Sequence, residues 1–343
     1  MASYRSTIPH LGLTSTSRIL VQNLTGRSAT MHARLSIANR TNIVAGTTSA
    51  KNIAKFSQGV TGGAVTHPEL KIPLHTTVRD AIAAHKEETG NHNYDATAVF
   101  VPPQGAADAI LEAIENEIPL IVSVAEGIPT RDQFRVMAAL HSQSKSRLVG
   151  ANSPGYTCAY GPRLGIAPVA AALPGCIGIA ARSGTLSYEA MGATKDIGIG
   201  QSYILGLGGD LYPGTRMDEA LEFLLSDPTT SGIVLLGEVG GTMEEDVASY
   251  LHSLRPEQRG HKPIVGFIAG RGVPQGLRNY GHAGAFWTDN AGDADSKRRM
   301  WKDAGIIVVD RVGDTATAVR DELCRLRQLP DEVNYELRTG KKR

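Results

Sequence analysis

Residues 176–189 read CIGIAARSGTLSYE, and this stretch decides the fold expected for the second half of the chain. An uninterrupted apolar run leads into a Ser-Gly-Thr turn, and a polar helix start follows the turn. A short apolar run bounded by turn residues is typical of a buried strand in a parallel sheet. Residues 232–246, which read GIVLLGEVGGTMEED, repeat the order of strand, glycine turn and polar helix start. Each such unit is ordinary in α/β proteins, and two of them predict this class of fold.

Both turns lead into a helix, whose first amides have no partner within the helix itself. Together with the positive end of the helix dipole, these amides favour a bound anion. A third stretch, GHAGA at 281–285, places His282 between small residues that leave the backbone open to a large anionic group. Neutral imidazole is available near pH 7 and can act as a nucleophile. A lone histidine is more often a polar core or surface residue, but two helix starts aimed at it predict a phosphohistidine pocket.

The rest of the chain alternates short apolar strands with helices, which favours parallel, doubly wound sheets. In the first half we expect strands near 19–21, 42–44, 96–101, 120–124 and 147–150, with helices near 78–86 and 106–117. In the second half we expect strands near 177–181, 202–207, 232–236, 263–269 and 306–309. The Ser-Pro-Gly break at 153–155 predicts a boundary, with domains at 18–152 and 153–328 and a solvated tail at 329–343.

The composition limits the classes of function. The 343 residues suit two domains of ordinary size. The 35 basic and 34 acidic side chains nearly cancel, which argues against a general nucleic-acid or membrane-surface binder. The three cysteines, Cys158, Cys176 and Cys324, lie far apart without zinc spacing, so a reducing compartment fits best and no metal site is expected. No apolar run approaches the length of a transmembrane helix.

The N-terminal residues combine a basic character with an early strand. No Asp or Glu occurs before Glu69, whereas five arginines do, and this bias is typical of a mitochondrial transit peptide. Because the first strand begins near residue 18, residues 1–17 are left for a short targeting segment, and their single arginine is Arg5. We therefore predict a location in the mitochondrial matrix, with the cytosol as the alternative.

Several motifs together resemble one known family. They are AARSGTLSYEA at 180–190, GEVGG at 237–241 and YGHAGA at 280–285, with VPP at 101–103, AEGIPT at 125–130 and GLGGD at 206–210. In these motifs and in their order, over roughly residues 19–325, the chain resembles the α subunit of succinyl-CoA ligase, also called succinyl-CoA synthetase. The motifs are highly specific when they occur together.

The resemblance implies an α/β fold, in which a Rossmann-like CoA-binding domain precedes a flavodoxin-like doubly wound ligase domain. It implies a reversible reaction in which succinate, CoA and ATP or GTP give succinyl-CoA, a nucleoside diphosphate and phosphate. The nucleotide would bind with Mg²⁺ to a partner β subunit, in a heterodimer or in a heterotetramer of two such pairs. The intermediates would be a phosphohistidine and succinyl phosphate.

For the site itself, the resemblance makes His282 the residue that takes the γ-phosphoryl group and passes it to succinate. Glu238 would bind one ring nitrogen, fix the tautomer and leave the other nitrogen free to attack. Tyr188 would help to hold the carboxylic substrate, although core packing is the other interpretation of this residue. The phosphate-binding residues would be Ser183, Gly184, Thr185, Gly240 and Gly241.

The loop after the first strand is where a Rossmann-like domain binds a pyrophosphate. The family has glycines where this chain has Asn23 and Ala29, and extra residues follow Lys51, at roughly 52–60. Asparagine tolerates positive φ better than most residues, and alanine can replace the last glycine of such loops. The CoA-contacting residues implied by the resemblance are Thr25, Gly26, Arg27, Ser28, Lys51, Val124, Ala125 and Glu126.

Two other functions remain open. Ala151 and Ser153 replace residues that are usual in the family near the active site, which favours a diverged paralogue that activates another short carboxylic acid. The altered loop at 23–29 favours a non-catalytic, regulatory α-like subunit, but the retained His282 and Glu238 oppose that interpretation. An NAD dehydrogenase is disfavoured because no intact Gly-x-Gly-x-x-Gly follows the first strand.

Overall fold

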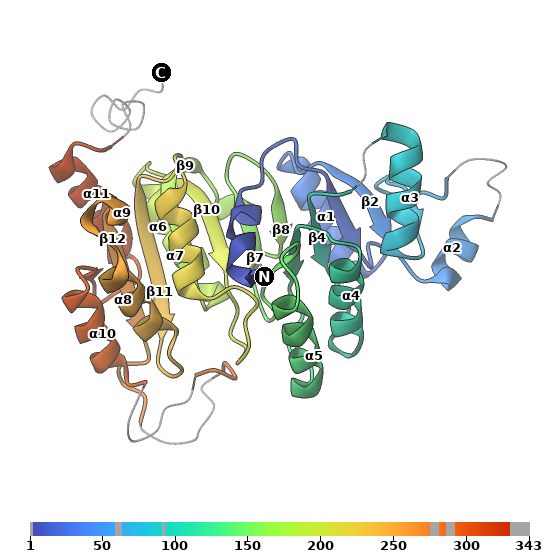
Figure 1. Ribbon diagram of the computed structural model, residues 1–343. Coiled ribbons are helices and arrows are strands. Elements are labelled where there is room, and N and C mark those ends of the chain that lie inside the picture. The colour runs from blue at the N-terminus through green and yellow to red at the C-terminus, as the bar shows by residue number, and fades with distance from the viewer. Residues whose placement is uncertain (1–2, 59–63, 91–92, 275–280, 286–291, 330–343) are drawn as a thin grey trace. The chain divides into compact units, whose positions relative to one another are not determined.

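The computed structural model of the chain describes residues 3–58, 64–90, 93–274, 281–285 and 292–329. These residues form two compact units (Figure 1). Unit 1 comprises Met1–Gly155 and Gly161–Val169, and unit 2 comprises Tyr156–Tyr160 and Ala170–Arg343. Among the residues described, no helix has both the length and the apolar character needed to cross a bilayer.

Unit 1 contains a parallel sheet with the strand order β3-β2-β1-β4-β5-β6. Its strands are β1 (Ile19–Gln22), β2 (Ile43–Thr47), β3 (Leu74–His75), β4 (Ala96–Val99), β5 (Leu120–Ser123) and β6 (Arg147–Val149). Every residue of β1, β4 and β5 is buried, as expected for a parallel sheet that helices cover on both faces. The order 3-2-1-4-5-6 is that of the Rossmann fold, so the Rossmann-like prediction is confirmed.

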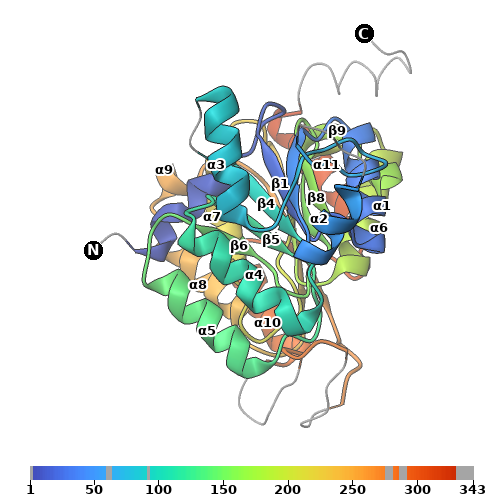
Figure 2. The same ribbon diagram turned by 90° about the vertical axis from the view of Figure 1, so that its right-hand side faces the viewer.

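The helices of unit 1 alternate with its strands. They are α1 (Arg27–Ala38), α2 (Ala50–Phe56), α3 (Val78–Thr89), α4 (Pro103–Glu115) and α5 (Thr130–His141). Helices α4 and α5 lie side by side (Figure 2). Helix α4 begins at Pro103, earlier than the predicted residue 106, because the first position of a helix does not need the N–H that proline lacks. The side chains of Ser49 and Thr77 cap α2 and α3 by accepting backbone N–H groups.

The segment before β1 is also folded. Residues Tyr4–Leu11 form a 3-10 helix, η1, which contacts the edge strand β6. The buried Arg147 donates from Nε to Thr7 Oγ1 at 3.0 Å, and its guanidinium lies 4.5 Å from the centre of the Tyr4 ring. The Tyr4 hydroxyl accepts the Leu148 N–H at 3.0 Å. Part of the segment 1–17, for which a targeting role is predicted, therefore packs as part of unit 1.

Unit 2 contains the strands β9 (Pro174–Ala181), β10 (Gln201–Gly206), β11 (Gly232–Glu238), β12 (Ile264–Ala269) and β13 (Ile307–Val308). Their order is β13-β12-β11-β9-β10, and all these pairings are parallel. Numbered in chain order from β9, the strands read 2-1-3-4-5, which is the flavodoxin-like order, and this prediction is confirmed. The strand β7 (Gly155–Cys158), which the sequence analysis does not predict, pairs antiparallel with β10 and makes the sheet mixed.

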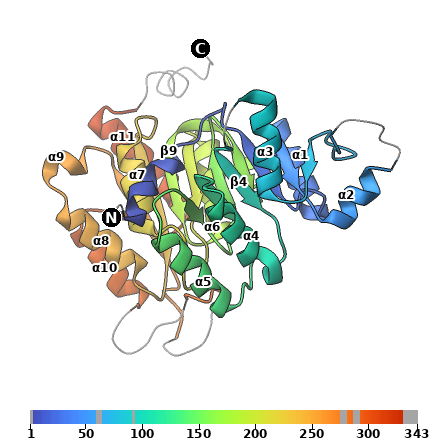
Figure 3. The same cartoon turned by 45° about the vertical axis from the view of Figure 1, so that its right-hand side comes forward.

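The helices of unit 2 cover its sheet in two sets. They are α6 (Gly184–Asp196), α7 (Met217–Ser226), α8 (Met243–Ser253), α9 (Pro256–Arg259), α10 (Ala294–Asp303) and α11 (Asp314–Leu326), with a 3-10 turn, η2 (Val169–Ala171). Helix α8 contacts α7 and α10, which is seen for α8 and α10 in Figure 3, whereas α6 contacts α11. Both sets contact the central strands, whose buried core includes Ile177, Val234 and Val265. This arrangement is the doubly wound pattern.

The boundary between the units is more complex than the predicted single break at 153–155. After β7, the segment Gly161–Val169 returns to unit 1 and contains β8 (Arg163–Gly165). The buried Arg163 explains this return, because its Nη1 donates to Ser36 Oγ at 2.9 Å and its backbone N–H donates to Thr41 Oγ1 at 3.0 Å. A proline–glycine break marks where a chain turns, but it does not reveal a partner 122 residues away.

A buried histidine organises the chain before β3. The Nδ1 atom of His67 accepts the N–H groups of Glu69 at 3.2 Å and Leu70 at 3.1 Å, and Nε2 lies 3.1 Å from Thr30 Oγ1. These contacts need the neutral ring, because a protonated Nδ1 would face two N–H donors. Burial lowers the pKa of His67 from its ordinary value of 6.5, and the charge of Glu69 opposes this shift.

This histidine predicts a loss of stability in mild acid. The unfolded chain binds a proton on His67 more readily than the folded chain does, so the free energy of unfolding falls as the pH drops below about 6.5. We expect the urea midpoint to fall between about pH 7.5 and about pH 5.5, and to fall less in His67→Asn. The exposed His252→Asn should retain the full fall. An undiminished fall in His67→Asn would contradict this role.

Candidate active site

Glu238 and His282 form a hydrogen-bonded pair in unit 2. Glu238 is the last residue of β11, and His282 lies in the described segment 281–285. His282 Nδ1 is 2.7 Å from Glu238 Oε2. The side chain of Glu238 is 8% exposed, whereas that of His282 is 26% exposed. An ionised carboxylate can only accept, so Nδ1 carries a proton, and in the neutral ring Nε2 then keeps its lone pair.

The imidazole of His282 packs against a glycine from the loop that follows β10. A Cβ atom on Gly209 would lie 2.4 Å from His282 Cγ, so a side chain at this position would displace the ring. The Gly284 N–H donates to the Gly209 carbonyl at 3.2 Å, and the Ala285 N–H donates to the His282 carbonyl at 3.0 Å. The glycine at position 209 of the GLGGD motif is therefore explained by steric space, because any side chain there would collide with the His282 ring.

A buried arginine lies on the other side of Glu238. Arg182 follows β9 directly, and its side chain is 2% exposed. Its Nη2 is 3.1 Å from Glu238 Oε1, and its Nη1 is 3.1 Å from Glu244 Oε1. Burial alone would lower the pKa of Arg182, but the negative charges of Glu244 and Glu238 raise it above its usual value. Arg182 is therefore a permanent positive charge beside the candidate site.

Glu244 and Lys297 form a second buried ion pair, and both side chains are 0% exposed. Burial alone would raise the pKa of the Glu244 carboxyl, but the charges of Arg182 and Lys297 outweigh it and lower that pKa. Lys297 Nζ also lies 3.1 Å from Glu245 Oε2. None of these charged residues is among the predicted site residues. Two features of the sequence could have indicated this network. One is an arginine directly after an apolar strand, and the other is a glutamate in the first turn of a helix.

The predicted phosphate-binding residues lie in two turns. Ser183 is the N-cap of α6, and its side chain makes no capping hydrogen bond within the described residues, so the helix start can accept an anion. Gly240 and Gly241 lie between β11 and α8, with φ values of 87° and 63°. The Gly240 N–H donates to the Gly292 carbonyl at 2.8 Å, so this amide is already used in the arrangement observed. Gly184 and Thr185 are the first two residues of α6.

Tyr188 lies on α6, one turn beyond these residues. Its side chain is partly buried and packs against the hydrophobic core of unit 2. This position favours the packing interpretation that the sequence left open. Contact with a carboxylic substrate stays a prediction.

The candidate site lies where the strand order of unit 2 reverses. Strands β9 and β11 are neighbours, and the helices that follow them, α6 and α8, belong to the two different sets. In open α/β sheets, ligands bind outside the carboxyl ends of the strands at this switch point. Ser183 follows β9 and Glu238 ends β11, so the fold itself places both at the expected ligand position.

Unit 1 has its own switch point, between β1 and β4. Asn23 follows β1 with a φ of 60°, a conformation that asparagine tolerates better than most residues. Its Nδ2 donates to the Phe100 carbonyl after β4 at 3.0 Å. Asn23 therefore spans the switch point, and the replacement of a family glycine is compatible with the turn.

The predicted CoA loop of unit 1 is supported by a cluster of polar side chains. Thr25 Oγ1 bonds Thr48 Oγ1, and Asn52 Nδ2 donates to these two oxygens at 2.9 Å and 3.0 Å. Asn52 lies on α2, in the segment that the sequence analysis treats as extra. Gly26 is the N-cap of α1, and Arg27 and Ser28 are its first residues, so this loop presents a helix start to an anion.

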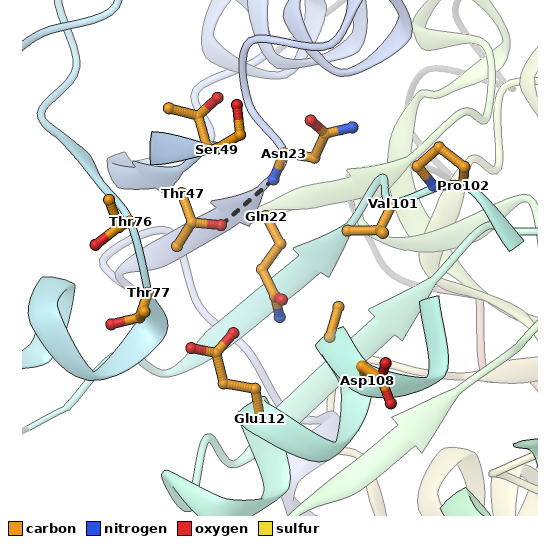
Figure 4. A pocket seen from close by; sticks show the side chains of 12 residues that line it. Gln22, Asn23, Thr47, Ser49, Thr76, Thr77, Val101, Pro102, Asp108 and Glu112 are labelled. Carbon is orange, nitrogen blue, oxygen red and sulfur yellow. Dashed lines mark hydrogen bonds between the residues drawn. The ribbon is translucent and has the colours of Figure 1, made fainter. Parts of the chain in front are cut away.

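A cavity of about 660 Å³ opens at the carboxyl ends of β1, β2 and β4 (Figure 4). Gln22, Thr47 and Thr76 line it with amide and hydroxyl groups, and Val101 and Pro102 give it an apolar wall. None of these five residues is among the predicted CoA-binding residues. Only their position in the sequence could have indicated them, because each lies at or just beyond the end of a parallel strand.

The remaining predicted CoA residues lie at the same edge of the sheet. Val124, Ala125 and Glu126 follow β5, and the buried Ala125 accepts the Asn152 N–H through its carbonyl at 2.9 Å. Lys51 is exposed on α2. Since the strands are parallel, the residues that follow β1, β2 and β5 share one edge. Direct contact of these side chains with CoA stays a prediction.

The polar cluster predicts a role for Asn52 in CoA binding. Asn52→Ala removes the donor that fixes Thr25 and Thr48, and the loss of about one net hydrogen bond should weaken CoA binding about fivefold in calorimetry. Asn93→Ala is a matched control in the same unit, because Asn93 Nδ2 also donates to two oxygens, the carbonyls of Asn116 at 3.2 Å and Glu117 at 3.0 Å. Equal CoA affinity in both variants would contradict the role of Asn52.

Comparison with known proteins assigns the two units to families. Residues 14–127 match the CoA binding domain family, and residues 181–307 match the CoA-ligase family. The α subunit of ADP-forming succinate–CoA ligase from Staphylococcus epidermidis is 35% identical over 305 residues, which cover 89% of this chain and 92% of that protein. The chain belongs to the succinate–CoA ligase α-subunit family. The family resemblance seen in the sequence motifs is thereby confirmed.

Other relatives of this chain include one that is named for a different acid. Subunit α 1 of the ADP-forming succinate–CoA ligase from Archaeoglobus fulgidus is 35% identical, over 89% of this chain and 95% of that protein. The malate–CoA ligase α subunit from Methylorubrum extorquens is 34% identical, over 90% of this chain and 96% of that protein. All three are named as α subunits, which implies a partner subunit. They come from bacteria and an archaeon, so they do not support the predicted mitochondrial matrix location.

Solved structures show the same fold in larger proteins. ATP citrate lyase from Methanothrix soehngenii, determined in complex with citrate and coenzyme A, matches with a TM-score of 0.76 and 23% identity. The match covers 97% of this chain and 56% of that protein. At this level of identity the likeness concerns the fold.

Proposed function

We propose that this chain is the α subunit of a nucleotide-dependent succinate–CoA ligase, which forms succinyl-CoA reversibly through a phosphohistidine at His282. The observation that carries the proposal is the 2.7 Å hydrogen bond between His282 Nδ1 and Glu238 Oε2. With the proton on Nδ1, the neutral ring is unprotonated at Nε2, in a unit that belongs to the CoA-ligase family.

In the proposed first step, the Nε2 lone pair attacks the γ-phosphorus of ATP or GTP, which binds with Mg²⁺ to the partner β subunit. An N–P bond forms at Nε2, and the P–O bond to the nucleoside diphosphate breaks. No proton has to leave Nε2, because the ring proton is on Nδ1. The phosphorylated ring is positively charged, and the carboxylate of Glu238 stabilises it.

The transferred group is an anion, and the start of α6 supports its binding. Ser183, Gly184 and Thr185 offer hydroxyl groups, first-turn amides and the positive end of the helix dipole. Donors that are fixed before the reaction stabilise developing charge without reorganisation. The small neighbours Ala283 and Gly284 leave space for the phosphoryl group beside His282.

In the later steps, a succinate carboxylate oxygen attacks the phosphorus, and the N–P bond to His282 breaks. The CoA thiol loses its proton to water, and the thiolate sulfur then attacks the acyl carbon of succinyl phosphate. A C–S bond forms, the acyl C–O bond breaks, and phosphate leaves. Unit 1 supplies CoA binding in this scheme, through the loop at 25–28 and the cavity beside it. We propose assembly with the β subunit as a heterodimer or as two such pairs.

A second candidate function keeps the same chemistry with another short dicarboxylic acid. One observation favours it specifically, since the malate–CoA ligase α subunit is as similar to this chain as the succinate enzymes are. The buried Ala151 and Ser153, where the family usually has other residues, lie in the loop after β6 and are consistent with a changed acid.

The proposed function predicts a labelled histidine. The chain is co-purified with a β subunit and incubated with Mg²⁺ and ATP or GTP that carries a γ-phosphate label. We expect label that is labile in acid and stable in base, and that succinate plus CoA discharges. His282→Asn should abolish the label, whereas His252→Asn, at the exposed end of α8, should retain it.

The same experiment separates the candidate functions. Discharge by another dicarboxylic acid, but not by succinate, would establish the second candidate. Absence of label on the wild-type chain with a competent β subunit would contradict both candidates and favour a regulatory subunit.

A further inference from the structure

A group of charged side chains lies behind Glu238 and is not used in the chemistry above; all are nearly fully buried except Glu245, whose side chain is 21% exposed. It contains Arg182 and Lys297 as cations and Glu244 and Glu245 as anions, and these side chains belong to three different segments of unit 2. Buried charges are costly unless they are paired, so a group of this size needs an explanation. We name these four residues, together with Glu238, the charge cluster.

The two oxygens of Glu238 have different surroundings. Oε2 accepts the hydrogen bond from His282 Nδ1 at 2.7 Å. Oε1 is buried and accepts no hydrogen bond from the described residues, and Arg182 Nη2 lies 3.1 Å from it. The positive charge of Arg182 therefore compensates the burial of Oε1. Without this charge, the carboxylate would be more stable if it took a proton or rotated towards solvent.

We propose that Arg182 is a positioning residue for the phosphoryl transfer, because it fixes the Glu238 carboxylate so that His282 is held in its Nδ1–H tautomer. This inference rests on the proposed function of His282. Arg182 acts through Glu238. If Glu238 were neutral, its O–H could donate to Nδ1, and if it were rotated, Nδ1 would lose its acceptor. In either case the ring proton could move to Nε2, where it would block the attack.

Arg182 can do this because its own position is fixed. Its Nη1 donates to the Gly240 carbonyl at 2.9 Å and lies 3.1 Å from Glu244 Oε1. Glu244 Oε1 also accepts the backbone N–H of Glu238 at 3.0 Å. One carboxylate therefore sets the positions of both the arginine and the backbone of Glu238.

Glu244 is fixed in turn by contacts from α10. Lys297 Nζ pairs with Glu244 Oε2, and the Trp301 ring N–H donates to the Glu244 carbonyl at 2.9 Å. A Cβ atom on Gly237 would lie 2.7 Å from Glu244 Cγ, so the glycine of the GEVGG motif leaves room for this side chain. The charge cluster thus connects β9, β11, α8 and α10 directly behind the nucleophile.

The variants must separate positioning from stability. Arg182→Met alone leaves the buried charges of Glu238 and Glu244 uncompensated, which is strongly destabilising. The double variant Arg182→Met/Glu244→Gln removes one charge of each sign, so the net charge of the cluster is unchanged. Glu244→Gln alone is the reference for the double variant. Arg182→Lys tests whether a charge without the fixed guanidinium geometry suffices.

Arg298→Met is the matched control for removing an arginine. Arg298 lies on α10 in the same unit, its side chain is 10% exposed, and it pairs with Asp310 at 2.6 Å. Its partners do not include Glu238 among the interactions of the described residues. Arg298→Met should lower the free energy of unfolding without changing the tautomer of His282.

Two readouts are measured on the full chain in complex with its β subunit. The first is the pair of ¹⁵N chemical shifts of the His282 ring in histidine-labelled protein, assigned by their loss in His282→Asn. These shifts distinguish a protonated from an unprotonated ring nitrogen, so they report the tautomer. The second is the single-turnover rate at which His282 takes the phosphoryl group from saturating nucleotide.

We expect the double variant to lose the Nδ1–H tautomer as its major form and to transfer phosphoryl roughly 10²-fold more slowly than Glu244→Gln. Arg182→Lys should lie between these two variants, and Arg298→Met should match the wild type in both readouts. An unchanged tautomer together with a rate within about twofold of Glu244→Gln would overturn the role of Arg182.

Failure of the proposed function gives a different result. If the wild-type complex takes up no phosphoryl group, the ligase function of His282 is contradicted. The ring shifts still decide whether Arg182 controls the tautomer. A double variant whose ring shifts equal those of the wild type would then count against Arg182 as a positioning residue.

Discussion

The carboxylate of Glu238 is buried, and its burial constrains much of unit 2. A buried anion needs a compensating charge, and Arg182 supplies it from the end of the neighbouring strand. That arginine is itself paired with Glu244, which pairs with Lys297 from α10. As a result, Nδ1 of His282 has a fixed acceptor, and Nε2 of the neutral ring can act as a nucleophile. Fold and chemistry are thus linked through one ion network at the switch point of the sheet.

Local sequence patterns, together with the family resemblance, were sufficient to predict the fold class and the central pair. The stretch at 176–189 contains the strand, the turn and the helix start, and the structure has β9 and α6 there. The family resemblance supplied Glu238 and His282, which the fold brings within hydrogen-bond distance. The network behind them could not be predicted in this way. Lys297 lies 53 residues from Glu244, and no local pattern shows which distant cation will pair with a buried carboxylate.

The polar site of unit 1 could also be predicted only in part from the sequence. Its first loop was predicted from its place after a strand, and it does begin α1. The hydroxyl groups of the neighbouring cavity come from several loops, such as those of Thr47 and Thr76, and only the sheet brings them to one edge. Asn52 is another example. It lies in a segment that looks like an insertion in the sequence, yet its side chain donates a hydrogen bond to Thr25 in the predicted CoA loop. Similarly, Arg163 joins unit 1 through a partner 122 residues away.

The position of the phosphoryl group on the imidazole tests the account most directly. The wild-type complex, labelled with ¹⁵N-histidine, is phosphorylated, and the coupling between ³¹P and the ring nitrogens of His282 is measured. The account predicts coupling that places phosphorus on Nε2, because Glu238 holds the proton on Nδ1. A phosphoryl group on Nδ1, or on a residue other than His282, would contradict it.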